Sequence, residues 1–84
     1  MEEGAEGAAA AKAQGNAALA AKDYAEAIRC YTAAIALDGS SHVYYSNRSA
    51  AHLGAASYGD AVIDADRCIQ LKPDFAKGYG RKVG

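Results

Sequence analysis

The sequence of 84 residues contains no tryptophan, a single proline and a single phenylalanine, and none of its apolar stretches is long. A membrane-spanning helix needs about 18 or more apolar residues in a row, so no membrane segment is expected. The N-terminus has no basic region followed by an apolar one, so we expect no signal peptide. The expected location is the cytoplasm, or also the nucleus.

An excess of charge of either sign is also missing. Nine basic and ten acidic residues leave a formal net charge of -1. This balance is too even for a protein that binds nucleic acid or a membrane surface through charge, so neither partner is expected. The first ten residues hold three acidic residues and no basic one. We expect residues 1–7 to form a flexible acidic tail.

Motifs for chemistry are absent as well. Cys30 and Cys68 are far apart and lack a C-x-x-C spacing, so we expect reduced core residues. His42 and His52 are not arranged as H-E-x-x-H and have no cysteine pair nearby, so no metal is expected. No G-x-S-x-G, phosphate-binding loop or G-x-G-x-x-G occurs. The sequence therefore predicts neither an enzyme nor a cofactor.

What the sequence does contain is alanine, at 22 positions, and an internal repeat. Alanine favours helix and lets helices pack closely. At a constant offset of about 34 residues, six pairs of apolar residues coincide: Tyr24 and Tyr58, Ala27 and Ala61, Ile28 and Val62, Ile35 and Ile69, Leu37 and Leu71, and Tyr45 and Tyr79. Because these matches have helical spacing, they indicate one core motif used more than once.

Signals for helix ends agree with this period. Asp23 followed by Glu26, and Ser57 followed by Asp60, predict two capping boxes that are one repeat period apart. Gly54 can end the helix that lies between them. We expect five helices, at about residues 5–21, 24–37, 41–54, 58–71 and 74–84.

A repeat of about 34 residues that contains two helices resembles the tetratricopeptide (TPR) repeat, from about Ala8 to the end of the chain. The residues that match the family's positions are Gly15, Ala27, Tyr31, Ala34, Ala61, Ala65, Cys68 and Pro73. The resemblance implies an all-α fold, a right-handed superhelix of antiparallel helix pairs. It implies a TPR domain at 8–84, with repeat 1 at about 8–41, repeat 2 at about 42–75 and an incomplete third repeat from 76.

Five polar residues share one face of the first helices, which line the concave surface of stacked repeats. Counted from Ala8, His42 and Ala76, they occupy repeat positions 2, 5, 6 and 9, which is a helical spacing. The five are Lys12, Asn16, Asn47, Lys77 and Arg81. Because lysine and arginine give charge-assisted hydrogen bonds and asparagine gives neutral ones, the set suits a carboxylate ligand.

This set resembles the two-carboxylate clamp of chaperone-binding TPR domains, most of all the first TPR domain of the Hop (stress-inducible) co-chaperones. The matching segments are KAQGN, YSNRSAAH and LKPDFAKGYGRK. The resemblance implies that Lys12, Asn16 and Asn47 hold a terminal α-carboxylate, and that Lys77 and Arg81 hold a side-chain carboxylate. It also implies the ligand, the Glu-Glu-Val-Asp C-terminus of cytosolic heat-shock chaperones, with the 70-kDa class favoured over the 90-kDa class.

Alternatives to the clamp stay open at this point. Lys77 and Arg81 could be solvated surface charges, and Asn47 could cap a neighbouring loop. The chain could instead be a general TPR scaffold without clamp activity, which self-associates through an uncapped C-terminal helix. Except for Tyr44, which is less clear, the tyrosines are expected to pack between helices: Tyr24, Tyr31, Tyr45, Tyr58 and Tyr79.

Overall fold

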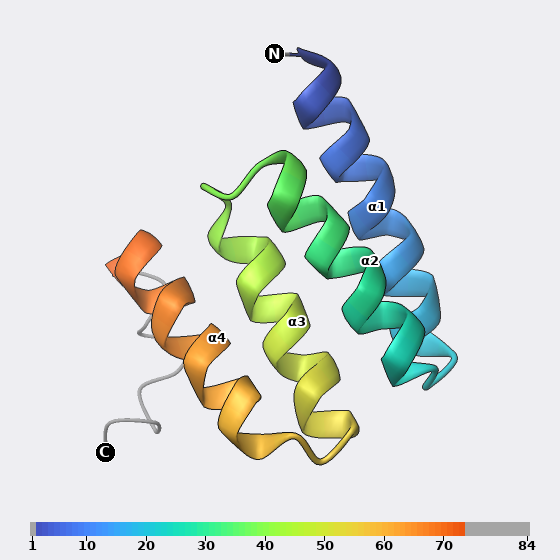
Figure 1. Cartoon of the computed structure of the whole chain (residues 1–84), viewed down its shortest axis with the longest axis vertical. Helices are drawn as coiled ribbons and strands as arrows, with labels where there is room; N and C mark the ends of the chain where they lie inside the picture. The colour runs from blue at the N-terminus through green and yellow to red at the C-terminus, as the bar shows by residue number, and fades with distance from the viewer. Residues whose placement is uncertain (1, 74–84) are drawn as a thin grey trace.

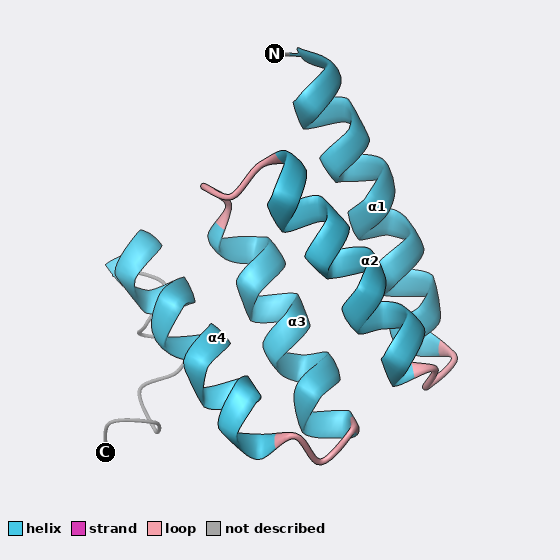
Figure 2. Ribbon diagram, viewed as in Figure 1, coloured by secondary structure: helices cyan, strands magenta, loops and turns pink. Residues whose placement is uncertain are grey.

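The computed structural model describes residues 2–73, with side-chain surroundings from residue 6. This part of the chain contains no strand and four helices: α1 (Glu2–Ala20), α2 (Tyr24–Leu37), α3 (His42–Gly54) and α4 (Tyr58–Leu71). Successive helices run in opposite directions and lie side by side in chain order (Figure 1, Figure 2). The predicted all-α architecture of antiparallel helix pairs is confirmed. The fifth predicted helix, 74–84, lies outside the described residues.

Helix α1 begins at Glu2, and so includes almost all of the segment that was expected to be a flexible tail. The difference has a physical reason, because the alanines that follow favour helix and acidic residues in a first turn interact well with the helix dipole. Packing also contributes. Ala8 is fully buried, and a β-carbon added at Gly7 would lie 3.1 Å from Leu37 Cδ1 of α2.

Only one of the two predicted capping boxes forms its cap. The Asp23 side chain accepts a hydrogen bond from the Glu26 backbone N–H at 3.3 Å. Ser57 is the N-cap residue of α4, as predicted, but its side chain makes no such bond, so the predicted capping box does not form there. The Glu26 carboxylate bonds Arg29 and Cys30. It is therefore turned along its own helix.

The turns within the two helix pairs are alike. Lys22 and Ala56, which are one repeat period apart, both have φ of 63°. Helix α3 does end at Gly54, as predicted, but the left-handed residue of this turn is Ala56. The Ser57 N–H then bonds the His52 carbonyl at 2.8 Å. The repeat is thus visible in the backbone as well as in the core residues.

The core is built from alanines and buried tyrosines. One cluster joins Ala8, Ala34 and Tyr44, and a second joins Ala27, Tyr31 and Ala51. Each cluster takes residues from α1 or α2 together with one residue from α3. The core therefore holds the first helix pair to the second.

Two glycines let tyrosine rings of α2 lie directly against neighbouring helices. A β-carbon at Gly15 of α1 would lie 2.5 Å from Cε1 of Tyr31. A β-carbon at Gly54 of α3 would overlap the ring of Tyr24. Only glycine allows such a close approach at these places. The rings fix how α1 and α3 are placed on the two sides of α2.

Helix α4 leaves large apolar side chains uncovered. Tyr58 is 64% exposed and Ile63 is 65% exposed. The prediction that Tyr58 packs between helices is wrong, because its side chain is mostly exposed, whereas the ring of its counterpart Tyr24 packs on Gly54 of the following helix. Tyr79, for which the same packing was predicted, lies outside those residues. None of the described helices is both long and apolar enough to cross a membrane.

Candidate carboxylate-binding site

The fold brings together two of the predicted site residues, Asn16 of α1 and Asn47 of α3. Asn47 Nδ2 donates a hydrogen bond to Asn16 Oδ1 at 3.4 Å, although 31 residues separate them. Asn16 is exposed and Asn47 is half-buried. Two amides from successive first helices therefore meet at the protein surface, and the bond to Asn16 replaces the loop cap considered for Asn47.

A third residue, Tyr31 of α2, belongs to the same group. Its hydroxyl donates to Asn16 Oδ1 at 2.6 Å, while its ring is fully buried. Burial raises the pKa of the Tyr31 phenol, so the hydroxyl stays protonated and remains a donor. The sequence predicts only a packing role for Tyr31. The signal for a second role is the residue type. A buried ring that only packs could be phenylalanine, whereas the hydroxyl of a buried tyrosine usually has a hydrogen-bond partner.

Local sequence explains why the Tyr31 hydroxyl reaches Asn16. Gly15 directly precedes Asn16, and the missing side chain leaves room for the Tyr31 ring against α1. The ring therefore points its hydroxyl past the glycine to the next residue. The dipeptide Gly15-Asn16 thus supplies both the opening for the ring and the acceptor for its hydroxyl.

Lys12 lies one helical turn before Asn16 on α1 and is half-buried. Residues four apart share a helix face, so Lys12 and Asn16 lie on the same face of α1. Lys77 and Arg81 lie outside the described residues. Within those residues the site consists of one cation and two amides. Such a group offers hydrogen-bond donors to an anion.

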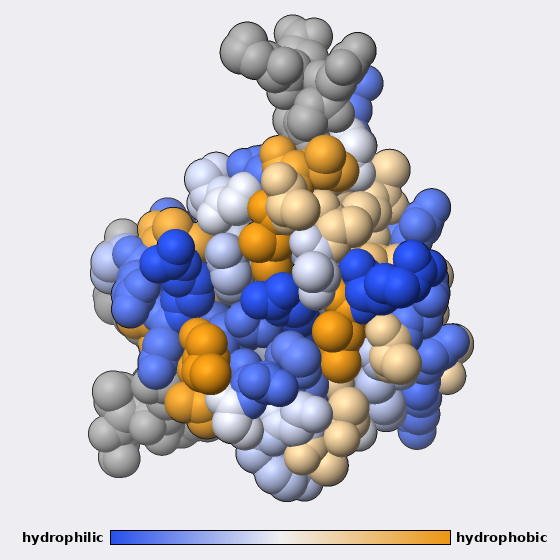
Figure 3. Space-filling model, viewed as in Figure 1, coloured by the Kyte–Doolittle hydropathy of each residue, from blue (hydrophilic) through white to orange (hydrophobic). Residues whose placement is uncertain are grey.

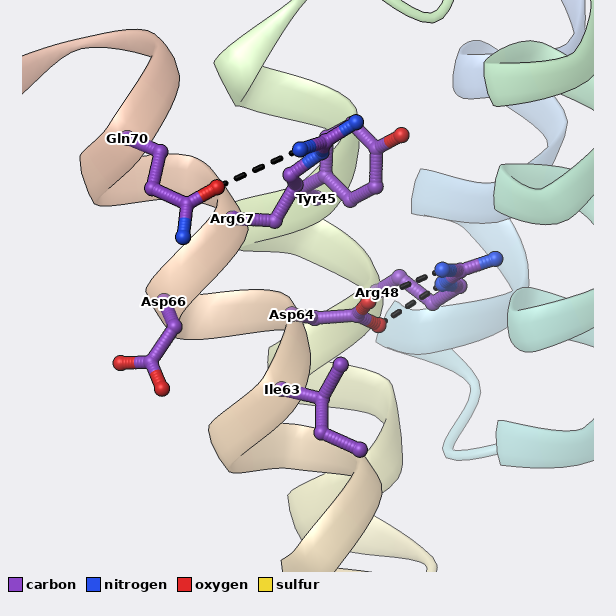
Figure 4. Close-up of a pocket in the computed structure, with 7 residues that line it drawn as sticks. All are labelled: Tyr45, Arg48, Ile63, Asp64, Asp66, Arg67 and Gln70. Carbon is purple, nitrogen blue, oxygen red and sulfur yellow. Dashed lines mark hydrogen bonds and ion pairs between the residues drawn. The ribbon is translucent and has the colours of Figure 1, made fainter.

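A pocket with a volume of about 400 Å³ lies between α3 and α4. Figure 4 shows the side chains that line it: Tyr45, Arg48, Ile63, Asp64, Asp66, Arg67 and Gln70. The guanidinium groups of Arg48 and Arg67 lie 5.7 and 5.9 Å from the centre of the Tyr45 ring. Arg67 also donates to Gln70 Oε1 at 3.2 Å.

The charges of Arg48 and Asp64, which line this pocket, are paired with each other. Arg48 donates to both carboxylate oxygens of Asp64, at 2.7 and 2.9 Å, and to Thr32 Oγ1 of α2 at 3.1 Å. Asp64 is 3% exposed, and His52 Nε2 lies 3.5 Å from its Oδ2. The hydrogen bond with Asp64 raises the pKa of Arg48. This network connects three helices, which is a structural role.

The cysteines are buried and unreactive in character. Cys30 and Cys68 are both free, as predicted, and Cys68 is fully buried. Burial raises the pKa of both thiols, so the neutral form is favoured. The described residues contain no group of three His, Cys, Asp or Glu side chains that could hold a metal ion.

The face of the molecule seen in Figure 3 is mixed in hydropathy. On the face seen in Figure 3, hydrophilic side chains form a band across the middle, and apolar side chains are scattered among them. A carboxylate-binding groove, unlike a site for an apolar helix, needs no continuous apolar surface.

Antiparallel helix pairs that recur with one constant period define a tetratricopeptide-repeat fold. Residues 8–41 match the family model described as tetratricopeptide repeat, so this part of the chain is a tetratricopeptide repeat. Those boundaries coincide with the first repeat that the sequence predicts.

Several of the relatives belong to one group within that class, the STI1/Hop proteins. A heat shock protein sti1 homolog of Schizosaccharomyces pombe is 54% identical over 71 residues, which are 84% of this chain and 12% of the relative. A protein STIP1 homolog of Dictyostelium discoideum is 50% identical over 83 residues, 99% of this chain and 15% of the relative. The Hsp70-Hsp90 organizing protein of Triticum aestivum is 52% identical over 71 residues, 84% of this chain and 12% of the relative. The chain thus spans a small part of each relative's length.

Proposed function

We propose that this chain is a co-chaperone adaptor module that binds the acidic Glu-Glu-Val-Asp C-terminus of heat-shock chaperones. The 70-kDa class is the favoured partner and the 90-kDa class is the other candidate. The observation that carries the proposal is the Asn16–Asn47 pair, which gathers donors from α1 and α3 beside Lys12. The names of the relatives, which include "Hsp70-Hsp90 organizing protein", agree with this partner class.

Each site residue has a part in this carboxylate clamp. The Lys12 ammonium supplies charge, and the Asn16 and Asn47 amides supply N–H groups to the α-carboxylate of the last peptide residue. Lys77 and Arg81 bind the side-chain carboxylate of that residue. A hydrogen bond to a charged group contributes about 1.5–3 kcal/mol, and ordering the peptide offsets part of the sum. The dissociation constant is therefore expected at about 1–100 μM.

The adaptor needs no chemistry of its own, so the proposal includes no enzymatic activity, cofactor or metal. It places the protein in the cytoplasm, where these chaperones are found. Its partners are other proteins, and nucleic acids and membranes are not among them.

The test is a fluorescence anisotropy titration of a labelled peptide ending in Ile-Glu-Glu-Val-Asp, with a free or an amidated C-terminus, at two salt concentrations. We expect the free acid to bind, amidation to weaken binding strongly, and salt to weaken it, because charge-assisted bonds to a carboxylate are screened. Equal binding of the acid and the amide, or no binding of either, contradicts the clamp. Peptides from the two chaperone classes, compared in the same assay, give the preference.

Substitutions localise the site. Lys12→Ala, Lys77→Ala or Arg81→Ala should each weaken binding at least several-fold. Lys72→Ala is the matched control, because Lys72 caps the end of α4 and is not on the face of the first helices. Unchanged affinity in all three site variants contradicts the assignment.

A second candidate function rests on the exposed side chains of α4. Tyr58, Val62 and Ile63 are each more than half exposed. A scaffold that self-associates would cover them with a second copy of the chain. Analytical ultracentrifugation across a wide concentration range tests this, and a monomer throughout contradicts it. In a self-associating chain, Val62→Glu should restore the monomer.

A further inference from the structure

The Asn16 side chain accepts two hydrogen bonds with one atom. Its Oδ1 receives the Tyr31 hydroxyl at 2.6 Å and Asn47 Nδ2 at 3.4 Å. A carbonyl oxygen has two lone pairs, so both are in use. The two N–H groups of Asn16 Nδ2 are not used by these contacts and point away from the pair of donors.

From this geometry we propose that Tyr31 is a positioning residue for the clamp. Its hydroxyl holds the Asn16 amide with Nδ2 toward the ligand, and so selects a free carboxylate over a carboxamide. The inference rests on the proposed function, and adds to it a residue that does not itself touch the peptide.

The orientation of Asn16 is held from both sides. If the amide turned over, Nδ2 would face the Tyr31 hydroxyl and the Asn47 N–H, and donors would meet donors. Relief would require the Tyr31 hydroxyl to rotate and the Asn47 amide to turn over as well. The Tyr31 ring itself cannot move aside, because it is fully buried against Gly15.

The fixed orientation of the Asn16 amide explains why a peptide with a free C-terminal carboxylate would bind better than one with a C-terminal carboxamide. A carboxylate has acceptors only, whereas a carboxamide presents an NH₂ group that also needs an acceptor. With Asn16 Oδ1 occupied, this amide has no acceptor to offer. The penalty for an unpaired polar group then falls on the amidated peptide alone.

The direct test is Tyr31→Phe, which keeps the ring and removes the hydroxyl. We expect affinity for the acid peptide to fall about three- to tenfold, the loss of one ordinary hydrogen bond, with a smaller change for the amidated peptide. The ratio of the two affinities should therefore shrink. A merely structural role would lower both affinities together and leave the ratio unchanged.

The chain contains a matched control in Tyr24→Phe. Tyr24 lies seven residues earlier on α2, and its ring also packs on a glycine. Its substitution should leave both affinities unchanged. An equal loss in the two variants overturns the inference.

A second variant keeps the inference testable even if Tyr31→Phe fails to fold. Asn16→Asp retains an acceptor for Tyr31 but places a second carboxylate oxygen where Nδ2 was. We expect at least a tenfold loss of acid-peptide binding with an unchanged melting temperature. Retained binding overturns the inference together with the role of Asn16 in the clamp.

The outcomes separate this inference from the proposed function. A wild-type chain that does not bind the acid peptide overturns both. A wild-type chain that prefers the acid, with the same preference in Tyr31→Phe, overturns the inference alone.

Discussion

At the scale of single residues, the contacts between tyrosines and glycines carry the most information. Tyr24 and Tyr31 lie on α2, and each ring occupies the space that a side chain would need at Gly54 and Gly15. These contacts set the distance of α2 from α1 and α3. A substitution at either glycine must therefore move a ring or a helix.

Gly15→Ala should lower the free energy of unfolding by about 1–3 kcal/mol, because an added methyl group overpacks a site already filled by Tyr31. It should also weaken peptide binding, since Tyr31 bonds Asn16. Urea denaturation and the peptide titration measure the two effects.

Gly59→Ala is the control for this experiment. Nothing lies within 4 Å of a β-carbon added there, and Gly59 is in α4. Alanine is favoured over glycine in a helix by about 1 kcal/mol, so this variant should be more stable than the parent chain. Equal stability loss in both glycine variants would contradict the packing explanation.

The two thiols give a second prediction at this scale. Burial raises their pKa, so the folded state favours neutral thiols. Below the ordinary thiol pKa of 9.0 both states are neutral and the full stability is present. As pH rises through the raised pKa of the folded state, the unfolded chain ionises first and the free energy of unfolding falls. Thiol labelling at pH 8 should therefore be slow in the native chain and fast in denaturant. Rapid labelling of the native chain contradicts the burial of Cys30 and Cys68.

At the scale of helices and turns, much could be predicted from the sequence. The repeat period placed α2, α3 and α4 to within one residue, since apolar spacing and Asp23 mark their ends. The start of α1 could not be predicted, because glycine and glutamate suggested a tail and the contact of Gly7 with Leu37 joins distant residues. The sequence also could not show that the Ser57 side chain makes no capping hydrogen bond. A cap depends on side-chain orientation, which residue type does not fix.

The two turns offer a test of the backbone geometry. Lys22 and Ala56 have positive φ, which costs a residue other than glycine about 1–2 kcal/mol. Ala56→Gly should therefore raise stability by about 0.5–1 kcal/mol after the greater entropy of glycine in the unfolded chain is subtracted.

Ala55→Gly is the comparison, because Ala55 has φ of -85° and no strain to relieve. It should be neutral or destabilising. A gain from Ala55→Gly as large as that from Ala56→Gly, measured by urea denaturation, would show that strain is not the cause.

At the scale of the whole molecule, Arg48 connects most of the described helices. It belongs to α3, forms a two-bond ion pair with Asp64 of α4, and reaches Thr32 of α2. Asp64 is almost fully buried, so removing its partner would leave a buried charge unpaired.

Arg48→Ala should therefore lower the free energy of unfolding by about 3–5 kcal/mol, which is a large share of the stability of a small domain. Thermal unfolding followed by circular dichroism measures it. Arg29→Ala is the control, because the Arg29–Glu26 pair is exposed and within one helix, and it should change little. Similar losses in the two variants would contradict a special role for the buried pair.

The candidate site shows where sequence reasoning reaches its limit. Helical spacing predicted that Lys12, Asn16 and Asn47 share a face, and the structure brings the two asparagines into contact. The contribution of Tyr31 comes from a third helix and from a hydroxyl at the end of a buried ring. Periodicity identifies which side chains are buried, but it does not show which polar atom a buried ring presents to the surface.

One consequence of that shared ring concerns how variants of this protein should be screened. Since Tyr31 lies in the core with its hydroxyl on Asn16, a core substitution can leave the chain folded while it turns an amide at the surface. Such a variant would pass every assay of expression, melting and helical content, and still fail to recognise a partner. Along the whole contact between α1 and α2, we therefore expect more substitutions to preserve the stability of the fold than to preserve recognition of the partner.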